Sequence, residues 1–394
     1  MRLSFKLLPL FLLFVFGASA SDVSESVTIQ FYSENITMTY DKEMMVSKKL
    51  LCASDKCLKK YHETMKAAPH KQLLDQLIAE RERLHLNDWL YAKLVRATVE
   101  KIYRKKKMAK SLAWWFFLCE SGYDIRVTFI DNSEIFLFVP SDDHPIKMSS
   151  FTEKDQKFYN LSSVILGVNT RGYELKKPKF KGNPKGKAFT FNLKTLPTFK
   201  AAPSPISVNW KYKEEEIKWR LKIDQTALML MKDYLTLSDM AYVETPVSAT
   251  LANSLLPKLK KMIKGKSQKE SLEVLVAFTR SAFNYKWDWD VYNADKPMYA
   301  EQVFDTEFSD HEDRCALLYY LVKELLDLPM IAITHYNNNM TLGVIIDEEM
   351  KRKYEYNGRN YTICDPTHPV SSCEINRYPN GLTYVTATVV GEYK

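Results

Sequence analysis

The stretch Ser309-Asp310-His311-Glu312-Asp313-Arg314-Cys315 opens the part of the sequence that decides the fold, and Tyr361-Thr362-Ile363-Cys364-Asp365-Pro366-Thr367 closes it. Between them, the helical spacing of apolar residues predicts a helix over 313–326. Strand-like apolar segments follow this helix. They lie at 330–334, 341–346 and 361–364. This order predicts α+β structure, in which a helix packs on an antiparallel sheet.

A helix start that faces such strands is the layout that a papain-type cysteine nucleophile requires. The helix dipole and a neighbouring histidine lower the pKa of the thiol, and a third residue on the next strand orients the histidine. In this chain the helix begins near His311, the strands carry Asn339 near their start, and Asp365 ends the last strand. We therefore expect these three residues to converge in one pocket.

The two motifs resemble the transglutaminase-like family of secreted bacterial proteins, the papain-like branch of Cys-His-Asp enzymes. In that family the first motif usually reads Asp-Cys-Glu-Asp-Arg, with the cysteine as the nucleophile. This sequence has His311 at the nucleophile position and Asn339 at the histidine position, whereas Asp365 matches the family's aspartate. The resemblance covers roughly 272–394. It implies the family's fold with degenerate catalytic residues.

Cys315 and His335 form the alternative catalytic pair. Cys315 lies one turn after His311 on the same helix face, and His335 precedes Asn339. Cys315 also opens the inward apolar stripe of the helix, which favours a buried, inert thiol. The leading hypothesis is a non-catalytic binding or scaffolding protein that uses the former active-site cleft. The alternative is a cysteine-dependent amidase, peptidase or transglutaminase that acts through Cys315, and the position of its sulfur discriminates between the two.

The chain divides into four predicted segments. Residues 1–20 form a signal peptide, 21–150 an N-terminal α+β domain, 151–266 a β-rich middle domain with a connector, and 267–394 the transglutaminase-like domain. Helix, aromatic-rich helix, strand and strand recur in the same order in the first and last domains. The N-terminal domain is therefore either a diverged copy of the C-terminal one or a coincidence among common α+β patterns.

The first residues predict export. Arg2 and Lys6 precede an apolar run over 7–16, and Ala18-Ser19-Ala20 supplies a small-residue cleavage motif. The apolar run is too short to cross a bilayer as a helix, which takes ~20 residues. We expect cleavage of this peptide and a periplasmic or extracellular location, and no later segment predicts a transmembrane helix. In an exported chain, Cys52 with Cys57, or Cys364 with Cys373, could form a disulfide.

Composition limits the partners. The formal net charge of +8 is modest for 394 residues, and the basic runs at 104–107, 176–187 and 258–266 lack the interleaved aromatic residues of a nucleic-acid surface. No nucleic-acid partner is expected. No histidine or cysteine spacing indicates zinc, so neither a metal nor a cofactor is expected. The expected partner is a protein, a peptide or a cell-envelope polymer.

Overall fold

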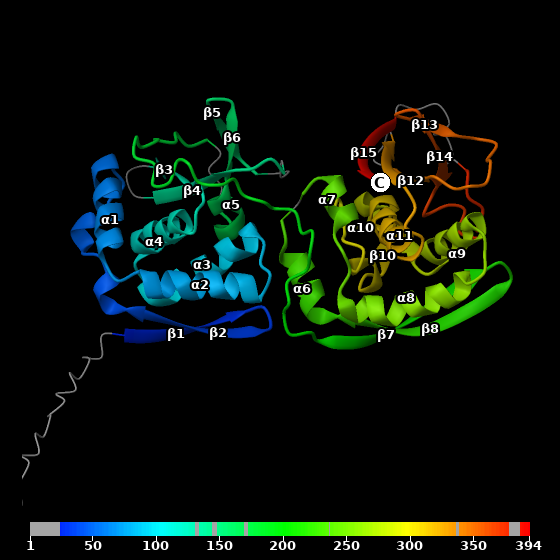
Figure 1. The fold of residues 1–394 in the computed structure, drawn as a ribbon, viewed down its shortest axis with the longest axis horizontal. Helices are drawn as coiled ribbons and strands as arrows, with labels where there is room; N and C mark the ends of the chain where they lie inside the picture. The colour runs from blue at the N-terminus through cyan, green and yellow to red at the C-terminus, as the bar shows by residue number, and fades with distance from the viewer. Residues whose placement is uncertain are drawn as a thin grey trace, which may run out of the picture.

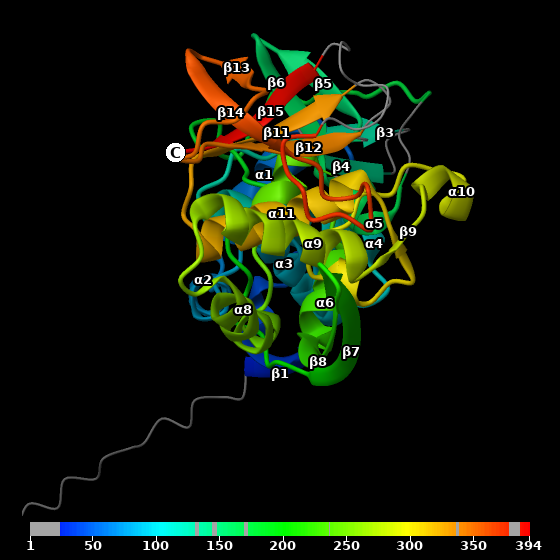
Figure 2. The same ribbon diagram turned by 90° about the vertical axis from the view of Figure 1, so that its right-hand side faces the viewer.

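The computed structural model describes residues 24–130, 134–143, 148–168, 172–235, 237–335, 339–377 and 387–394. The predicted signal peptide, residues 1–20, lies outside these ranges. The chain forms two lobes of mixed α and β structure that lie side by side (Figure 1). In each lobe, a two-stranded hairpin, a layer of helices and a larger antiparallel sheet follow one another from bottom to top of the view (Figures 1 and 2).

The first lobe contains the elements from β1 to α5. Its larger sheet has the strand order β3-β4-β6-β5. The elements are β1 (Ser24–Phe31), β2 (Glu34–Asp41), η1 (Lys42–Met44), η2 (Lys48–Leu50), α1 (Asp55–Ala67), α2 (Lys71–Arg83), α3 (Asp88–Tyr103), α4 (Lys107–Glu120), β3 (Arg126–Ile130), β4 (Glu134–Pro140), β5 (Ser150–Glu153), β6 (Gln156–Asn160) and α5 (Leu161–Leu166).

The second lobe contains the elements from β7 to β15. Its larger sheet has the strand order β13-β14-β12-β11-β15. The elements are β7 (Pro203–Tyr212), β8 (Glu215–Asp224), α6 (Gln225–Asp233), α7 (Asp239–Glu244), α8 (Ala249–Ile263), α9 (Gln268–Ser281), β9 (Asn284–Tyr285), α10 (Asp288–Tyr292), η3 (Gln302–Phe304), β10 (Phe308–Ser309), α11 (His311–Leu325), β11 (Met330–His335), β12 (Met340–Val344), β13 (Tyr354–Tyr356), β14 (Arg359–Cys364) and β15 (Ala387–Tyr393).

Local sequence fixes where two central helices begin. The N–H of Leu90 donates to the side chain of Asn87 at 3.1 Å, which caps α3. Helix α11 begins at His311, slightly before the predicted start at 313. The N–H of Asp310 donates to Oδ2 of Asp313 at 3.1 Å, and this bond holds the first turn of α11 in place.

The two lobes share a plan. Strand order β3-β4-β6-β5 in the first lobe corresponds to β11-β12-β14-β13 in the second. In the first lobe, Thr39 of β2 exchanges backbone hydrogen bonds of 3.0 and 2.8 Å with the side chain of Gln76 on α2. In the second, the backbone of Lys222 on β8 pairs with the hydroxyl of Ser254 on α8 at 3.0 and 3.2 Å. In each hairpin, a side chain from a neighbouring helix thus satisfies an edge N–H and C=O.

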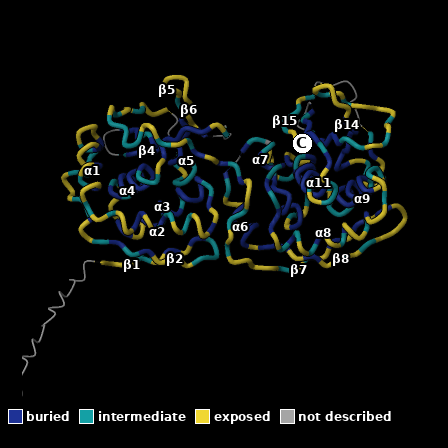
Figure 3. The backbone as a smooth tube through the Cα atoms, in the orientation of Figure 1, coloured by how far each residue is buried: buried dark blue, intermediate teal, exposed yellow. Residues whose placement is uncertain are grey.

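Two large apolar clusters form the core (Figure 3). One belongs to the first lobe and includes Phe189 and Phe191, whereas the other belongs to the second lobe and includes Trp210 and Leu251. Apolar residues of 151–266, the segment predicted as a β-rich middle domain, therefore divide between the two clusters. Strands β5 and β6 of this segment pair with the first lobe's sheet, and β7 packs against α9.

Two further sequence expectations meet the structure here. Cys52 and Cys57 form a disulfide, whereas Cys364 and Cys373 are free thiols, so only the first of the two candidate pairs is bonded. Within the ranges described above, no helix combines the length and the apolar character that crossing a bilayer requires.

Candidate functional site

The start of α11 follows β10, which pairs with a short strand, β9, that the sequence analysis did not predict. Strands β9 and β10 pair in parallel and set Tyr285 opposite Ser309. This pairing brings the Tyr285 hydroxyl to 3.0 Å from Nδ1 of His311, with the two rings edge to face. His311 itself is buried. Tyr285, which the sequence analysis did not name as a site residue, is thus a direct partner of His311.

Asp365 forms a turn at the end of β14. Its Oδ1 accepts hydrogen bonds from the backbone N–H and the hydroxyl of Thr367, at 2.8 and 2.7 Å. Burial lowers the pKa of His311, and the nearby carboxylate of Asp365 opposes this shift. His311 and Asp365 therefore interact electrostatically, and His311 is neutral at pH 7.

His335 lies at the end of β11 and is also buried. Its Nε2 is 2.8 Å from the hydroxyl of Thr341, and its Nδ1 has no hydrogen-bond partner. Burial lowers the pKa of His335, while Asp365 opposes the shift. Thus His335 shares the electrostatic neighbourhood of Asp365 with His311.

Asn339, the third predicted site residue, follows residues 336–338, which are outside the described ranges. Its carbonyl oxygen accepts from the N–H of His335 at 2.7 Å. Among the hydrogen bonds of the described residues, none joins the Asn339 side chain to His311 or Asp365. The hairpin residue that interacts with Asp365 is therefore His335, the residue named as an alternative.

Cys315, the alternative nucleophile, lies in the interior. Its side chain is 0% exposed and belongs to the apolar cluster of the second lobe, together with Leu318 and Val322. The sulfur therefore lies in the protein core and is closed to a substrate.

Two buried arginines tie the site together. The Nε of Arg280 donates to the carbonyl oxygen of Asp365 at 2.9 Å, and its Nη1 donates to the carbonyl of Ser372 at 2.7 Å. Arg314 donates to the Ser309 hydroxyl at 3.0 Å and to the carbonyl of Arg280 at 3.2 Å. Burial lowers the pKa of Arg314 to about 10, so it stays charged at pH 7. The arginines thus link α9, the start of α11 and the loop that carries Asp365.

His368, which the sequence analysis did not name, lies beside Tyr285 and His311. Its ring is 4.6 Å from the ring of Tyr285 and 6.1 Å from that of His311, measured between centroids. The signal for His368 was its place just after the Asp365 motif. The signal for Tyr285 was an aromatic residue shortly before the motif, but its distance from His311 depends on the β9–β10 pairing.

The residues that could hold a metal ion come from the starts of α10 and α11. One carboxylate oxygen from each of Asp288, Asp310 and Asp313 lies within 4.8 Å of the others. Burial raises the pKa of Asp288 to about 6 and the pKa of Asp313 well above its usual range, with further contributions from neighbouring carboxylates. The pKa of Glu312 is also raised, first by burial and then by Asp310.

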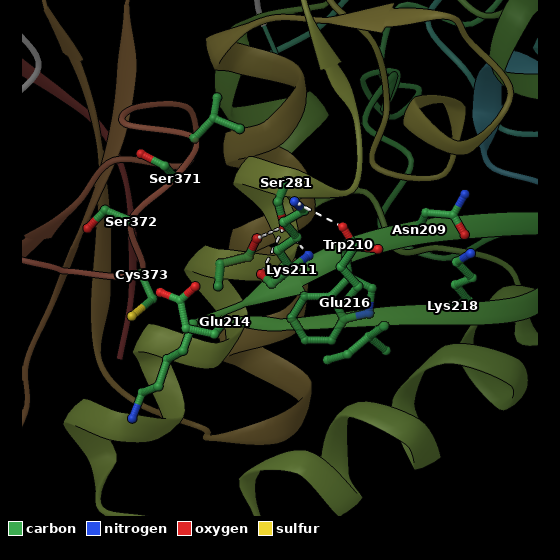
Figure 4. Close-up of a pocket in the computed structure, with 14 residues that line it drawn as sticks. Asn209, Trp210, Lys211, Glu214, Glu216, Lys218, Ser281, Ser371, Ser372 and Cys373 are labelled. Atoms are coloured by element: carbon green, nitrogen blue, oxygen red, sulfur yellow. Dashed lines mark hydrogen bonds and ion pairs between the residues drawn. The ribbon is translucent and has the colours of Figure 1, made fainter.

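A cavity of about 830 Å³ opens beside the Asp365 loop. Figure 4 shows Ser371, Ser372 and Cys373 on one side of it and the tip of the β7–β8 hairpin on the other. The hairpin contributes charged side chains, including Lys211 and Glu214. The Ser281 hydroxyl accepts from the N–H of Lys211 at 2.9 Å and fixes the hairpin to α9. The cavity thus has a mixed polar and apolar lining, which includes neither His311 nor Asp365.

No protein-family model matches this chain, and neither a curated protein nor a solved structure shows significant similarity to it.

Proposed function

We propose that this chain is an exported, non-catalytic binding protein whose second lobe has a transglutaminase-like fold with a degenerate active site. The observation that carries this proposal is the state of the nucleophile position. His311 stands there as a buried, neutral histidine that is engaged by Tyr285. A neutral imidazole held in this way does not replace a thiolate, and a thiol nucleophile must reach its substrate.

The cysteine-dependent alternative requires a reactive sulfur near a histidine. Cys315 is 0% exposed within the apolar cluster, so a substrate carbonyl could reach it only after local unfolding of α11. This burial favours the binding protein over an amidase, peptidase or transglutaminase.

In this proposal the first lobe is a diverged copy of the second. Both lobes share the strand order and the hairpin that docks on a helix. At the end of β6, Asn160 accepts from the N–H of Ser163, just as Asp365 accepts from that of Thr367 beyond β14. Helix α4 begins with lysines and carries no nucleophile at its start. Because neither lobe would then have a nucleophile at this helix start, a scaffolding function is favoured over catalysis.

The ligand that suits the cavity is an extended polar chain, such as a peptide of a protein partner or a cell-envelope polymer. The cavity of about 830 Å³ is lined by lysines, glutamates and serines together with Trp210, Ile217 and Val370, so hydrogen bonds and charge would act beside apolar contact in recognition. Arg280 connects its 370–373 wall to Asp365, which couples the cavity to the former active site.

Binding and turnover are tested separately on the folded chain. A pool of mixed-sequence peptides and purified peptidoglycan serve as binding probes. Ser371→Trp fills the cavity and should weaken binding about tenfold or more, whereas Ser24→Trp on the exposed start of β1 should not. Equal binding by both variants would remove the cavity from the proposal. Amide hydrolysis or transamidation that is present in the parent protein and absent in His311→Ala would overturn the non-catalytic assignment.

A further inference from the structure

A groove of about 710 Å³ lies where three helix ends meet in the second lobe. The ends of α8 and α11 and the start of α9 border it. Ile263 of α8 and Leu325 and Leu326 at the end of α11 contribute aliphatic side chains to its lining. Ile263 is buried, and both leucines are half-buried, so these side chains form the floor of the groove.

Lysines form the outer part of the same lining. Lys260, Lys261 and Lys264 are exposed, and Lys266 is half-buried. Among the described residues, no acidic side chain lines the groove, and no ion pair involves any of these four lysines. The Lys266 ammonium lies 5.8 Å from the centroid of the Tyr212 ring. The basic run at 258–266 thus borders a groove with its positive charges unpaired by carboxylates of the described residues.

The helix ends offset only part of this charge. A helix C-terminus carries roughly half a negative elementary charge, and an N-terminus carries roughly half a positive one. The C-termini of α8 and α11 and the N-terminus of α9 meet here, so together they offset roughly half of one lysine charge. Glu270 in the capping box of α9 adds one negative charge. An excess of roughly two to three positive charges therefore remains at the groove.

We propose that this groove binds an acidic peptide segment of a partner protein, with carboxylates at the lysines and aliphatic side chains on the floor. Charge complementarity calls for an anionic occupant. The described lining contains no aromatic ring on which a base could stack, which disfavours nucleic acid. A flat membrane surface would not reach Ile263, which is only 9% exposed. No described residue lines both this groove and the cavity beside Asp365, so the inference goes beyond the proposed function.

Peptide binding to the folded chain tests the proposal. The probe is a fluorescein-labelled peptide of glutamate and leucine, and fluorescence anisotropy at physiological ionic strength measures its affinity. Two matched peptides separate charge from apolar contact, since one has serine in place of leucine and the other has lysine in place of glutamate. We expect both to bind at least about tenfold more weakly than the glutamate–leucine peptide, because each loses one half of the recognition.

A double variant and a matched control locate the site. Lys260→Gln with Lys264→Gln should weaken binding of the glutamate–leucine peptide by about tenfold or more. Lys56→Gln with Lys60→Gln should not, although it removes the same charge at the same spacing from exposed positions of α1. Ser371→Trp, which fills the cavity of the proposed function, should leave this binding unchanged. Circular dichroism shows whether each variant folds. If the groove variant does not fold, the parent protein's preference for leucine over serine peptides decides the question.

Four outcomes would overturn the proposal. Equal weakening in the two double variants would mean that the peptide responds only to overall surface charge. Equal binding of the leucine and serine peptides would mean that the lysines act without the groove. Loss of binding in Ser371→Trp would move the peptide to the cavity. Tighter binding of anionic phospholipid vesicles or single-stranded DNA would assign the groove to another class of partner. The first, second and fourth outcomes leave the cavity, and with it the proposed function, untouched.

Discussion

At the scale of single residues, burial decides what the side chains of the candidate site can do. Cys315 lies on the core side of α11, and Cys373 lies half-buried in the wall of the cavity. His311 and His335 are both held neutral because burial outweighs the attraction of Asp365. The two cysteines thus differ in reactivity because their surroundings differ, and burial likewise sets the charge of the two histidines.

Alkylation should distinguish the two thiols. In the native protein, iodoacetamide is expected to modify Cys373 and to leave Cys315 unmodified, because only the first is accessible to solvent. Peptide mapping after brief labelling measures both sites, and labelling in denaturant shows that Cys315 reacts once unfolded. Rapid native modification of Cys315 would revive the enzyme alternative.

Acid should destabilise the fold through His335. Its pKa is lowered by burial, so the neutral form is favoured in the folded state. The resulting stability is present above the unfolded pKa of about 6.5 and is lost as the pH falls toward the lower folded pKa. Urea unfolding measures the free energy of unfolding at pH 7 and pH 5. Between these two pH values, this free energy should fall less in His335→Asn than in the parent protein. His85→Asn, at an exposed position, is the control, and equal losses in all three proteins would contradict the prediction.

At the scale of elements, the hairpins depend on the helices beneath them. A two-stranded hairpin is marginal by itself, and its edge groups need partners. Gln76 on α2 and Ser254 on α8 supply them in the two lobes. The same kind of contact occurs at corresponding places in both lobes. This similarity is stronger evidence for a shared architecture than the sequence patterns are.

Removing the Gln76 side chain should therefore destabilise the first lobe. Gln76→Ala leaves the N–H and C=O of Thr39 without their partner, and we expect a loss of about 1–3 kcal/mol. Gln72→Ala is the matched control, because its side chain is exposed on the same helix. Urea unfolding measures both variants. A loss in Gln76→Ala no larger than that in Gln72→Ala would mean that the hairpin does not depend on this contact.

At the scale of the whole molecule, aromatic side chains join the lobes. Tyr234 follows α6, and its hydroxyl donates to the carbonyl of Phe191 at 2.7 Å. Its ring lies 4.4 Å from that of Trp89 and 6.3 Å from that of Tyr299. Tyr299, from the second lobe, is buried within the first lobe's apolar cluster. The lobes therefore share part of their core.

Cutting this connection should uncouple the lobes. Tyr234→Ala removes a large aromatic ring between them, and we expect the free energy of unfolding to fall by about 3–5 kcal/mol. We also expect the single unfolding transition to separate into two. Differential scanning calorimetry detects the separation. Tyr173→Ala, at a side chain that is 57% exposed, should leave the trace unchanged. A single transition at the parent temperature in Tyr234→Ala would show that the lobes do not depend on this contact.

The sequence alone determined the local elements. The helical spacing over 313–326 predicted α11, and the apolar segments at 330–334, 341–346 and 361–364 predicted β11, β12 and β14. These features depend on near neighbours in the chain, so short-range patterns reveal them. The strand β15 was not predicted, and the 151–266 segment divides its apolar residues between two clusters that only the folded chain forms.

Tertiary structure alone decided the composition of the site. The β9–β10 pairing brings Tyr285 to His311, and the fold sets His335 near Asp365 and buries Cys315. Likewise, Asp288 joins Asp310 and Asp313 only because α10 folds back onto the start of α11. Spacing in the chain carries no information about such contacts, since they depend on how distant elements pack. The sequence thus located the turn that matters, and packing determined which residues face one another around it.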